Sequence, residues 1–139
     1  MLGLKRPERM PSMRDLQELV DYCLDKEGAV IDFPFGDIPV CVKFEGRIFA
    51  EIYPNESNYK ITLRCEPDVG ERYRNEYPGI VLPGYHVPLR QRKFKNTVLL
   101  DGDLPSSVLK EMIDHSYGTL RAQGAKRGVR EGPAKGERG

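Results

Sequence analysis

Apolar side chains recur at helical spacing near the start of the chain. Between Ser12 and Glu27 they form one stripe, and charged side chains occupy most of the remaining positions. Ser12 followed three residues later by Asp15 is a capping pattern, and Gly28 is a helix stop. The pattern predicts an amphipathic helix over this range. The apolar stripe consists of Met13, Leu16, Leu19, Val20, Cys23 and Leu24.

The apolar period then shortens to about two residues, which is typical of strands. Alternation predicts strands near 40–44 and 48–52 and a third over 59–65. Glu45-Gly46 lies between the first two and is a hairpin signal, because glycine supplies the positive φ of a tight turn. We expect three antiparallel strands in a meander.

The second half of the chain predicts two helices and two short strands. One helix starts at Pro67 and ends before Pro78, and apolar runs over 80–87 and 96–100 indicate strands. Asp103 is a candidate cap for a last helix whose apolar face reaches Leu120. The predicted fold class is α+β: a two-layer sandwich of order α-β-β-β-α-β-β-α, with N- and C-terminal helices on one face of a mainly antiparallel sheet.

Composition fits a single globular domain. The 139 residues are 39% hydrophobic and 31% charged, and no run approaches the roughly 18 apolar residues of a membrane span. The start "MLGLKRPERM" lacks a signal-peptide core, so we expect a cytoplasmic protein. Cys23, Cys41 and Cys65 are widely spaced, which favours small apolar thiols over a disulfide framework or a zinc site.

The ends of the chain are expected to lie outside the domain. Residues 122–139 hold five basic and two acidic residues together with five glycines, although the whole chain has a net charge of only +1. Such a segment buries little apolar surface and is predicted to be disordered. The expected organisation is therefore a flexible segment 1–11, one domain over 12–121 and a basic, glycine-rich tail over 122–139.

Three segments in this order carry a resemblance to a known family. They are "FPFGDIPVCVKFEGRIFA" (33–50), "ITLRCEPDVGERYRNEYPG" (61–79) and "PGYH…NTVLLDGDLPSSVLKEMIDHSY" (83–117). Over 12 to about 120 the chain resembles the MmcQ/YjbR family of small bacterial proteins. The resemblance implies a two-layer α/β sandwich related to the frataxin-like fold, a proposed DNA-binding role through a pair of β wings, and no established enzymatic activity.

The chain departs from the family between the last two predicted strands. The family commonly continues Gly-Tyr-His-Met with an Asn-Lys pair and then a His-Trp, whereas here Gly-Tyr-His-Val is followed by "PLRQRKFK". This loop is longer and more basic, and Phe94 is the only aromatic residue that can replace the missing Trp.

The basic cluster in this loop is the candidate binding site. We expect it to form a hairpin tip or wing whose cations contact the phosphate backbone of double-stranded DNA, weakly and without base preference. The competing interpretation is a solvated turn whose charges protect strand edges. The expected DNA-binding residues are Arg90, Arg92, Lys93 and Lys95, with Phe94, Tyr85 and His86 beside them and Lys43, Lys60 and Arg64 on the outward faces of the sheet.

Other functions have weaker support. A protein-interaction adaptor is the main alternative, with an unknown protein partner. Carboxylates of the first helix could hold a cation by analogy with frataxin-like domains; they are Asp15, Glu18, Asp21 and Asp25. Catalysis has the least support, because no Gly-x-Ser-x-Gly motif is present and nothing in the sequence pairs His86 with His115. We expect no cofactor and no metal.

Overall fold

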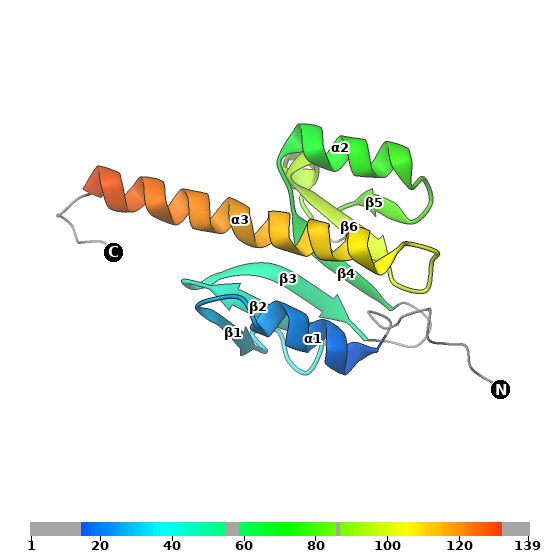
Figure 1. The fold of residues 1–139 in the computed structure, drawn as a ribbon, viewed down its shortest axis with the longest axis horizontal. Helices are drawn as coiled ribbons and strands as arrows, with labels where there is room; N and C mark the ends of the chain where they lie inside the picture. Colours follow the sequence, from blue (N-terminus) through cyan, green and yellow to red (C-terminus); the bar gives the residue numbers. More distant parts are fainter. Residues whose placement is uncertain (1–14, 55–58, 86, 132–139) are drawn as a thin grey trace.

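A computed structural model describes residues 15–54, 59–85 and 87–131. Its elements follow the predicted order with one added strand and one added 3-10 helix (Figure 1). They are α1 (Leu16–Leu24), β1 (Ala29–Asp32), β2 (Val40–Phe44), β3 (Arg47–Tyr53), β4 (Lys60–Arg64), α2 (Pro67–Glu76), β5 (Val81–Pro83), η3 (Leu89–Phe94), β6 (Lys95–Leu99) and α3 (Ser106–Glu131).

The six strands form one antiparallel sheet of order β1-β2-β3-β4-β6-β5. The hairpin between β2 and β3 turns at the predicted residues, where Glu45 has φ 52° and Gly46 has φ 80°. Positive φ at both central positions matches the right-handed twist of a hairpin. The expected meander is confirmed, and β4 is continued in the sheet by β6.

Helices cover one face of this sheet. α1 contacts β1 and β2, α3 contacts β3 and β4, and α2 contacts β5 and β6 (Figure 1). All three helices contribute to a single core, with Leu19 from α1, Tyr73 from α2 and Ile113 from α3. The predicted two-layer α+β fold is therefore confirmed.

The first strand was not predicted. β1 pairs with β2 at the sheet edge, and its central residues Val30 and Ile31 are both exposed. The alternation of apolar and polar residues that predicted the other strands is missing from Ala29–Asp32, where three apolar residues precede one acid. Asp15 caps α1 by accepting a hydrogen bond from the Gln17 N–H at 2.9 Å, and the proposed cap Ser12 lies outside the described residues.

The last helix extends beyond the predicted domain boundary at 121. α3 begins at Ser106, immediately after Pro105, and continues to Glu131, so the part of the tail from 122 to 131 is helical. The run "RAQ" and the later Ala and Lys residues favour helix strongly enough to continue past two glycines. The segments 1–11 and 132–139 lie outside the described residues. No helix in the described part of the chain is long and apolar enough to cross a bilayer.

A polar row lies on the face of the sheet opposite the helices. The strand register places Cys41, Glu51, Thr62 and Thr97 next to one another, and the two threonine hydroxyls are 2.7 Å apart. The Tyr85 N–H donates to the Thr97 hydroxyl at 2.7 Å. The chain that follows β5 is therefore fastened across this face of the sheet just before it enters η3.

Candidate nucleic-acid interface

The basic cluster forms a 3-10 helix and not the tip of a β wing. After Pro88 the chain turns into η3, where the Gln91 N–H donates to the Pro88 carbonyl at 2.8 Å. The C-terminal end of η3 is fixed by the Cys65 N–H, which donates to the Phe94 carbonyl at 2.8 Å. Because the segment 88–95 contains no Gly or Asn to adopt a tight hairpin turn, a short helix connects the strands instead.

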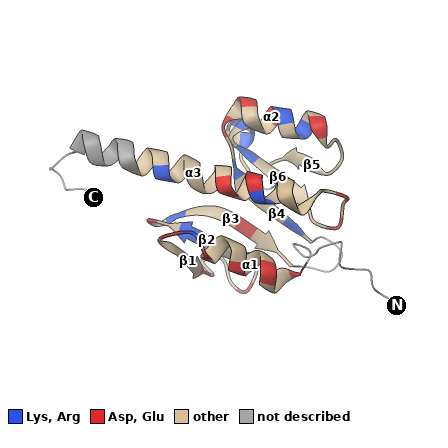
Figure 2. Cartoon of the chain, in the orientation of Figure 1, with Lys and Arg blue, Asp and Glu red and all other residues tan. Residues whose placement is uncertain are grey.

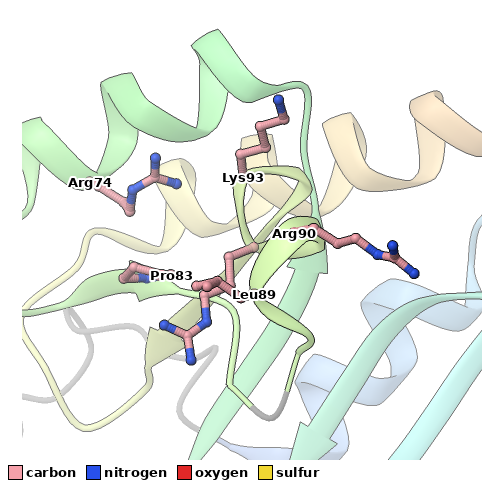
Figure 3. A pocket seen from close by; sticks show the side chains of 6 residues that line it. Arg74, Pro83, Leu89, Arg90 and Lys93 are labelled. Atoms are coloured by element: carbon pink, nitrogen blue, oxygen red, sulfur yellow. The ribbon is translucent and has the colours of Figure 1, made fainter.

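Three of the predicted cations are exposed on this helix. Arg90, Arg92 and Lys93 border an open pocket of about 500 Å³ together with Pro83 and the exposed Leu89. Arg74 reaches the same pocket from α2, a contribution that the sequence did not indicate (Figure 3). None of the described residues that line the pocket is acidic.

The cationic side chains of this pocket are spread out. In Figure 3 the charged ends of Arg74, Arg90 and Lys93 point in different directions. The Lys93 Nζ is 5.5 Å from the centre of the Phe94 ring, and Phe94 is half-exposed. This arrangement suits several separate anionic groups, such as successive phosphates, better than one compact anion.

The next two predicted cations are partly buried. Lys95 of β6 lies opposite Arg64 of β4, and the Arg64 Nε donates to the Ile48 carbonyl at 2.7 Å. Burial lowers the pKa of both side chains. The positive charge of Arg64 lowers the pKa of Lys95 further, and Glu51 opposes the effect at both sites. These two residues lie beside η3, at the margin of the exposed cluster.

Lys43 and Lys60, which the sequence placed among the expected DNA-binding residues, do not extend the exposed cluster. The Lys43 Nζ forms an ion pair with Asp32 at 2.7 Å. Lys60 is only 6% exposed, and its Nζ lies 4.2 Å from the centre of the Tyr85 ring and 5.3 Å from that of Tyr53. A cation enclosed by two aromatic rings is held by cation–π attraction and is inaccessible to a large ligand.

The aromatic residues of the predicted site have separate roles. Tyr85 packs its ring edge-on against Tyr53, with centres 5.4 Å apart, and anchors the segment to the sheet. Phe94 remains available beside the cations of η3. His86 lies outside the described residues. The His115 Nε2 accepts a hydrogen bond from the Glu66 N–H at 3.1 Å, which is a structural role at the start of α2.

Charge is distributed unevenly over the fold. α1 carries only acidic charges, whereas basic residues lie on η3 and along β4 and β6 (Figure 2). The carboxylates of α1 do not assemble a metal site, since the described residues contain no group of three or more His, Cys, Asp or Glu that could hold a metal ion. Two of them have local partners: Asp15 caps the helix, and Asp21 accepts from the Gln17 amide at 2.8 Å.

The chain is similar in sequence to known bacterial proteins. The family model described as YjbR matches residues 24–119. The uncharacterized protein YjbR of Escherichia coli K12 is 29% identical over 102 residues, which cover 73% of this chain and 83% of that protein. The YjbR protein of Escherichia coli O157:H7 matches equally well.

Solved structures agree with this similarity. A Deinococcus radiodurans protein with a DUF419 domain superimposes with a TM-score of 0.73 and 28% identity, covering 83% of this chain and 86% of that chain. A Pseudomonas syringae protein superimposes with a TM-score of 0.59 at 23% identity, covering 73% and 95% of the two chains, which supports the fold alone. Because the family model spans most of the sheet and helices described above, the chain belongs to the YjbR family.

Proposed function

We propose that this protein binds double-stranded DNA weakly and without base preference, through phosphate contacts made by η3. The observation that carries the proposal is the exposed set of Arg90, Arg92 and Lys93, with Arg74 beside them, around a pocket whose described lining contains no acid. Long cationic side chains attract a polyanion and release its counterions. The role is one of binding only, in the bacterial cytoplasm, where DNA is accessible.

The small number of phosphate contacts limits the affinity of such binding. Three phosphate contacts give a slope of log affinity against log salt of about −2.7, so raising salt from about 50 to about 200 mM weakens binding about 40-fold. Binding of this kind is measurable at low salt and is sequence-independent. The spread of the charged ends favours contacts along a backbone over recognition of base edges.

Fluorescence anisotropy of a labelled random duplex tests the proposal. The variant with Arg90, Arg92 and Lys93 all changed to Gln is expected to lose most of the affinity and the salt dependence. A matched control changes Lys26, Lys110 and Arg121 to Gln. It removes the same formal charge from the surroundings of α1, where Lys26 and Lys110 lie over the Tyr22 ring and Arg121 pairs with Glu27.

The possible outcomes separate η3 from other sources of positive charge. Equal weakening by both triple variants would mean that only total charge matters, which would overturn the assignment to η3. A version ending at Glu131 tests the tail, because loss of binding in that version alone would move the site to 132–139. Failure of the unaltered chain to bind at low salt would overturn the proposal altogether.

A protein-interaction adaptor is the second candidate, favoured by exposed apolar residues beside the β1 edge. Val30, Phe33, Phe35 and Ile38 are exposed, and Phe35 is 65% exposed. An apolar rim on a free strand edge is a common docking surface for a protein partner. Pull-down with the unaltered chain and with Phe33→Ser/Phe35→Ser would test it, and a partner retained equally by both would contradict this surface.

A further inference from the structure

A second, more enclosed pocket lies on the other side of η3. Its volume is about 410 Å³, and its walls come from the end of β4, the start of α2, η3, β6 and α3. Arg64 and Lys95 supply charge, Phe94 and Pro67 supply apolar surface, and Gln91 and Gln123 supply amide groups. Most of these residues are far apart in the sequence and meet only in the folded chain.

The two cations of this pocket are close together and lack a carboxylate partner. Arg64 and Lys95 occupy opposite positions of the β4–β6 pairing, and neither forms an ion pair with any described residue. The Arg64 Nε is bound to the Ile48 carbonyl, and its terminal NH₂ groups make no hydrogen bond to another described residue. Arg47 adds a third cation nearby, held by the amide of Gln123.

Half-buried like charges of this kind favour an anion between them. Burial disfavours the charged forms of Arg64 and Lys95, and Glu51 compensates only in part. An anion that contacts both side chains restores the lost solvation with charge-assisted hydrogen bonds, which are stronger in a partly buried site than in water. A doubly charged group matches the two cations best.

The apolar wall of the pocket indicates what the anion is attached to. Phe94 is 46% exposed and faces the same pocket as Pro67. An aromatic ring offers a flat surface on which a planar group stacks. Among the described residues, Glu66 is the one acid that lines the pocket. It lies exposed at the start of α2, where its charge weakens the attraction for an anion.

We infer that this pocket binds a phosphomonoester of a flat heteroaromatic group, with the phosphate on Arg64 and Lys95 and the ring against Phe94. A phosphomonoester carries a charge of about −1.5 to −2 at neutral pH. A free nucleoside monophosphate and the 5′-phosphorylated end of a single strand share this chemistry. The site is distinct from the duplex contacts of Arg90 and Arg92, which border the other pocket. Lys93 borders that pocket too, but its Nζ also lies 5.5 Å from the centre of the Phe94 ring.

Isothermal titration calorimetry with adenosine 5′-monophosphate tests the inference. Binding is expected to be about tenfold or more tighter than that of adenosine or of inorganic phosphate, because each of these lacks one half of the interaction. A short oligonucleotide with and without a 5′-phosphate forms the second arm. Preference for the phosphorylated strand over the free nucleotide would identify strand ends as the source of the ligand.

Variants locate the ligand in the pocket. Lys95→Gln is expected to weaken nucleotide binding about tenfold, Phe94→Leu to remove the preference for the nucleotide over phosphate, and Glu66→Gln to tighten binding. Glu66 is exposed and accessible to substitution, so a gain of affinity cannot come from misfolding. The double variant Arg90→Gln/Arg92→Gln is the matched control and is expected to keep nucleotide binding, because neither residue lines this pocket.

Two results would overturn the inference. One is equal affinity for the nucleotide and for inorganic phosphate, and the other is nucleotide binding that neither Lys95→Gln nor Glu66→Gln changes. Absence of heat at millimolar nucleotide, confirmed by unchanged NMR spectra of the folded protein, would also overturn it. None of these results bears on duplex binding, which is measured separately on the same samples, so the two proposals can fail independently.

Discussion

Asn96 of β6 holds Arg74 of α2. The Arg74 Nη1 donates to the Asn96 Oδ1 at 2.7 Å, and the Asn96 Nδ2 donates to the Gly70 carbonyl at 3.2 Å. Asn96 is completely buried. One side chain therefore fastens α2 to β6 at two points and also fixes the residue by which α2 reaches the pocket beside η3.

Replacing this asparagine is expected to destabilise the fold. Asn96→Ala leaves the Gly70 carbonyl and the Arg74 guanidinium without their partner, and buried groups that lose a hydrogen bond cost about 2–3 kcal/mol of unfolding free energy. Urea denaturation followed by circular dichroism measures the loss. Asn75→Ala on the exposed side of α2 is the control and should stay within about 0.5 kcal/mol. Equal effects of the two changes would contradict this role of Asn96.

Two glycines in helices are expected to respond in opposite directions to the same change. A Cβ at Gly70 would meet the Sγ of the buried Cys65 at 2.5 Å, so Gly70→Ala must displace packed atoms, at a cost of about 1–3 kcal/mol. A Cβ at Gly118 meets nothing within 4 Å. Gly118→Ala should therefore stabilise α3 by about 0.5–1 kcal/mol. Thermal unfolding measures the change in stability of both variants. A stabilising Gly70→Ala would show that the Cys65 side chain can move.

The hydroxyl of Tyr59 is expected to cost stability. It is buried and makes no hydrogen bond to any described residue, and burial raises the pKa of Tyr59 to about 12. Tyr59→Phe removes a polar group that is separated from water and keeps the ring, so the unfolding free energy should rise by about 1 kcal/mol or stay unchanged. A loss of more than about 1 kcal/mol in urea denaturation would mean that the hydroxyl has a partner in solution.

The fold is expected to weaken in alkaline solution because its thiols are buried. Burial raises the pKa of Cys23 to about 12 and those of Cys41 and Cys65 to about 11. The folded chain therefore keeps protons that the unfolded chain releases above a pKa of about 8.5. The contribution of the protonated thiols to the unfolding free energy is fully present below that pH and is lost as the pH rises toward 11.

Urea midpoints between neutral pH and about pH 10.5 measure this decline. Thiol reagents give an independent check: the folded protein should react slowly at about pH 8, and all three thiols should react at once after unfolding. Rapid reaction of the folded protein would show that at least one thiol is exposed, and a flat pH profile would show that the thiols do not contribute.

Sequence periodicity predicted most of the fold because apolar residues recur at helical spacing or alternate with polar residues in most elements. The hairpin at Glu45-Gly46 and the start of α2 at Pro67 were predicted at the residues where they occur. β1 was missed because Val30 and Ile31 are both exposed at the sheet edge. The length of α3 was underestimated because the segment after 121 is rich in glycine and has almost no large apolar residue, so no apolar periodicity marks its helical part.

The candidate site was predicted only in part. Local charge identified Arg90, Arg92 and Lys93, which lie together because they share one short helix. Nothing local distinguishes the exposed Lys93 from the enclosed Lys60, since Lys60 is covered by aromatic rings from β3 and from the segment after β5. Arg74 joins the pocket only through the packing of α2. DNA binding stays a prediction.

The fastening of the chain on both sides of η3 has a consequence for how such a surface changes during evolution. The Tyr85 N–H is bonded to the Thr97 hydroxyl, and the Tyr85 ring contacts the Tyr53 ring and the Lys60 ammonium group. The Phe94 carbonyl accepts a hydrogen bond from the Cys65 N–H. The backbone of η3 is therefore preorganised, so the entropic cost of ordering it is met during folding and not on binding. Single exchanges on η3 are therefore expected to change the charge of this surface while the scaffold keeps its shape.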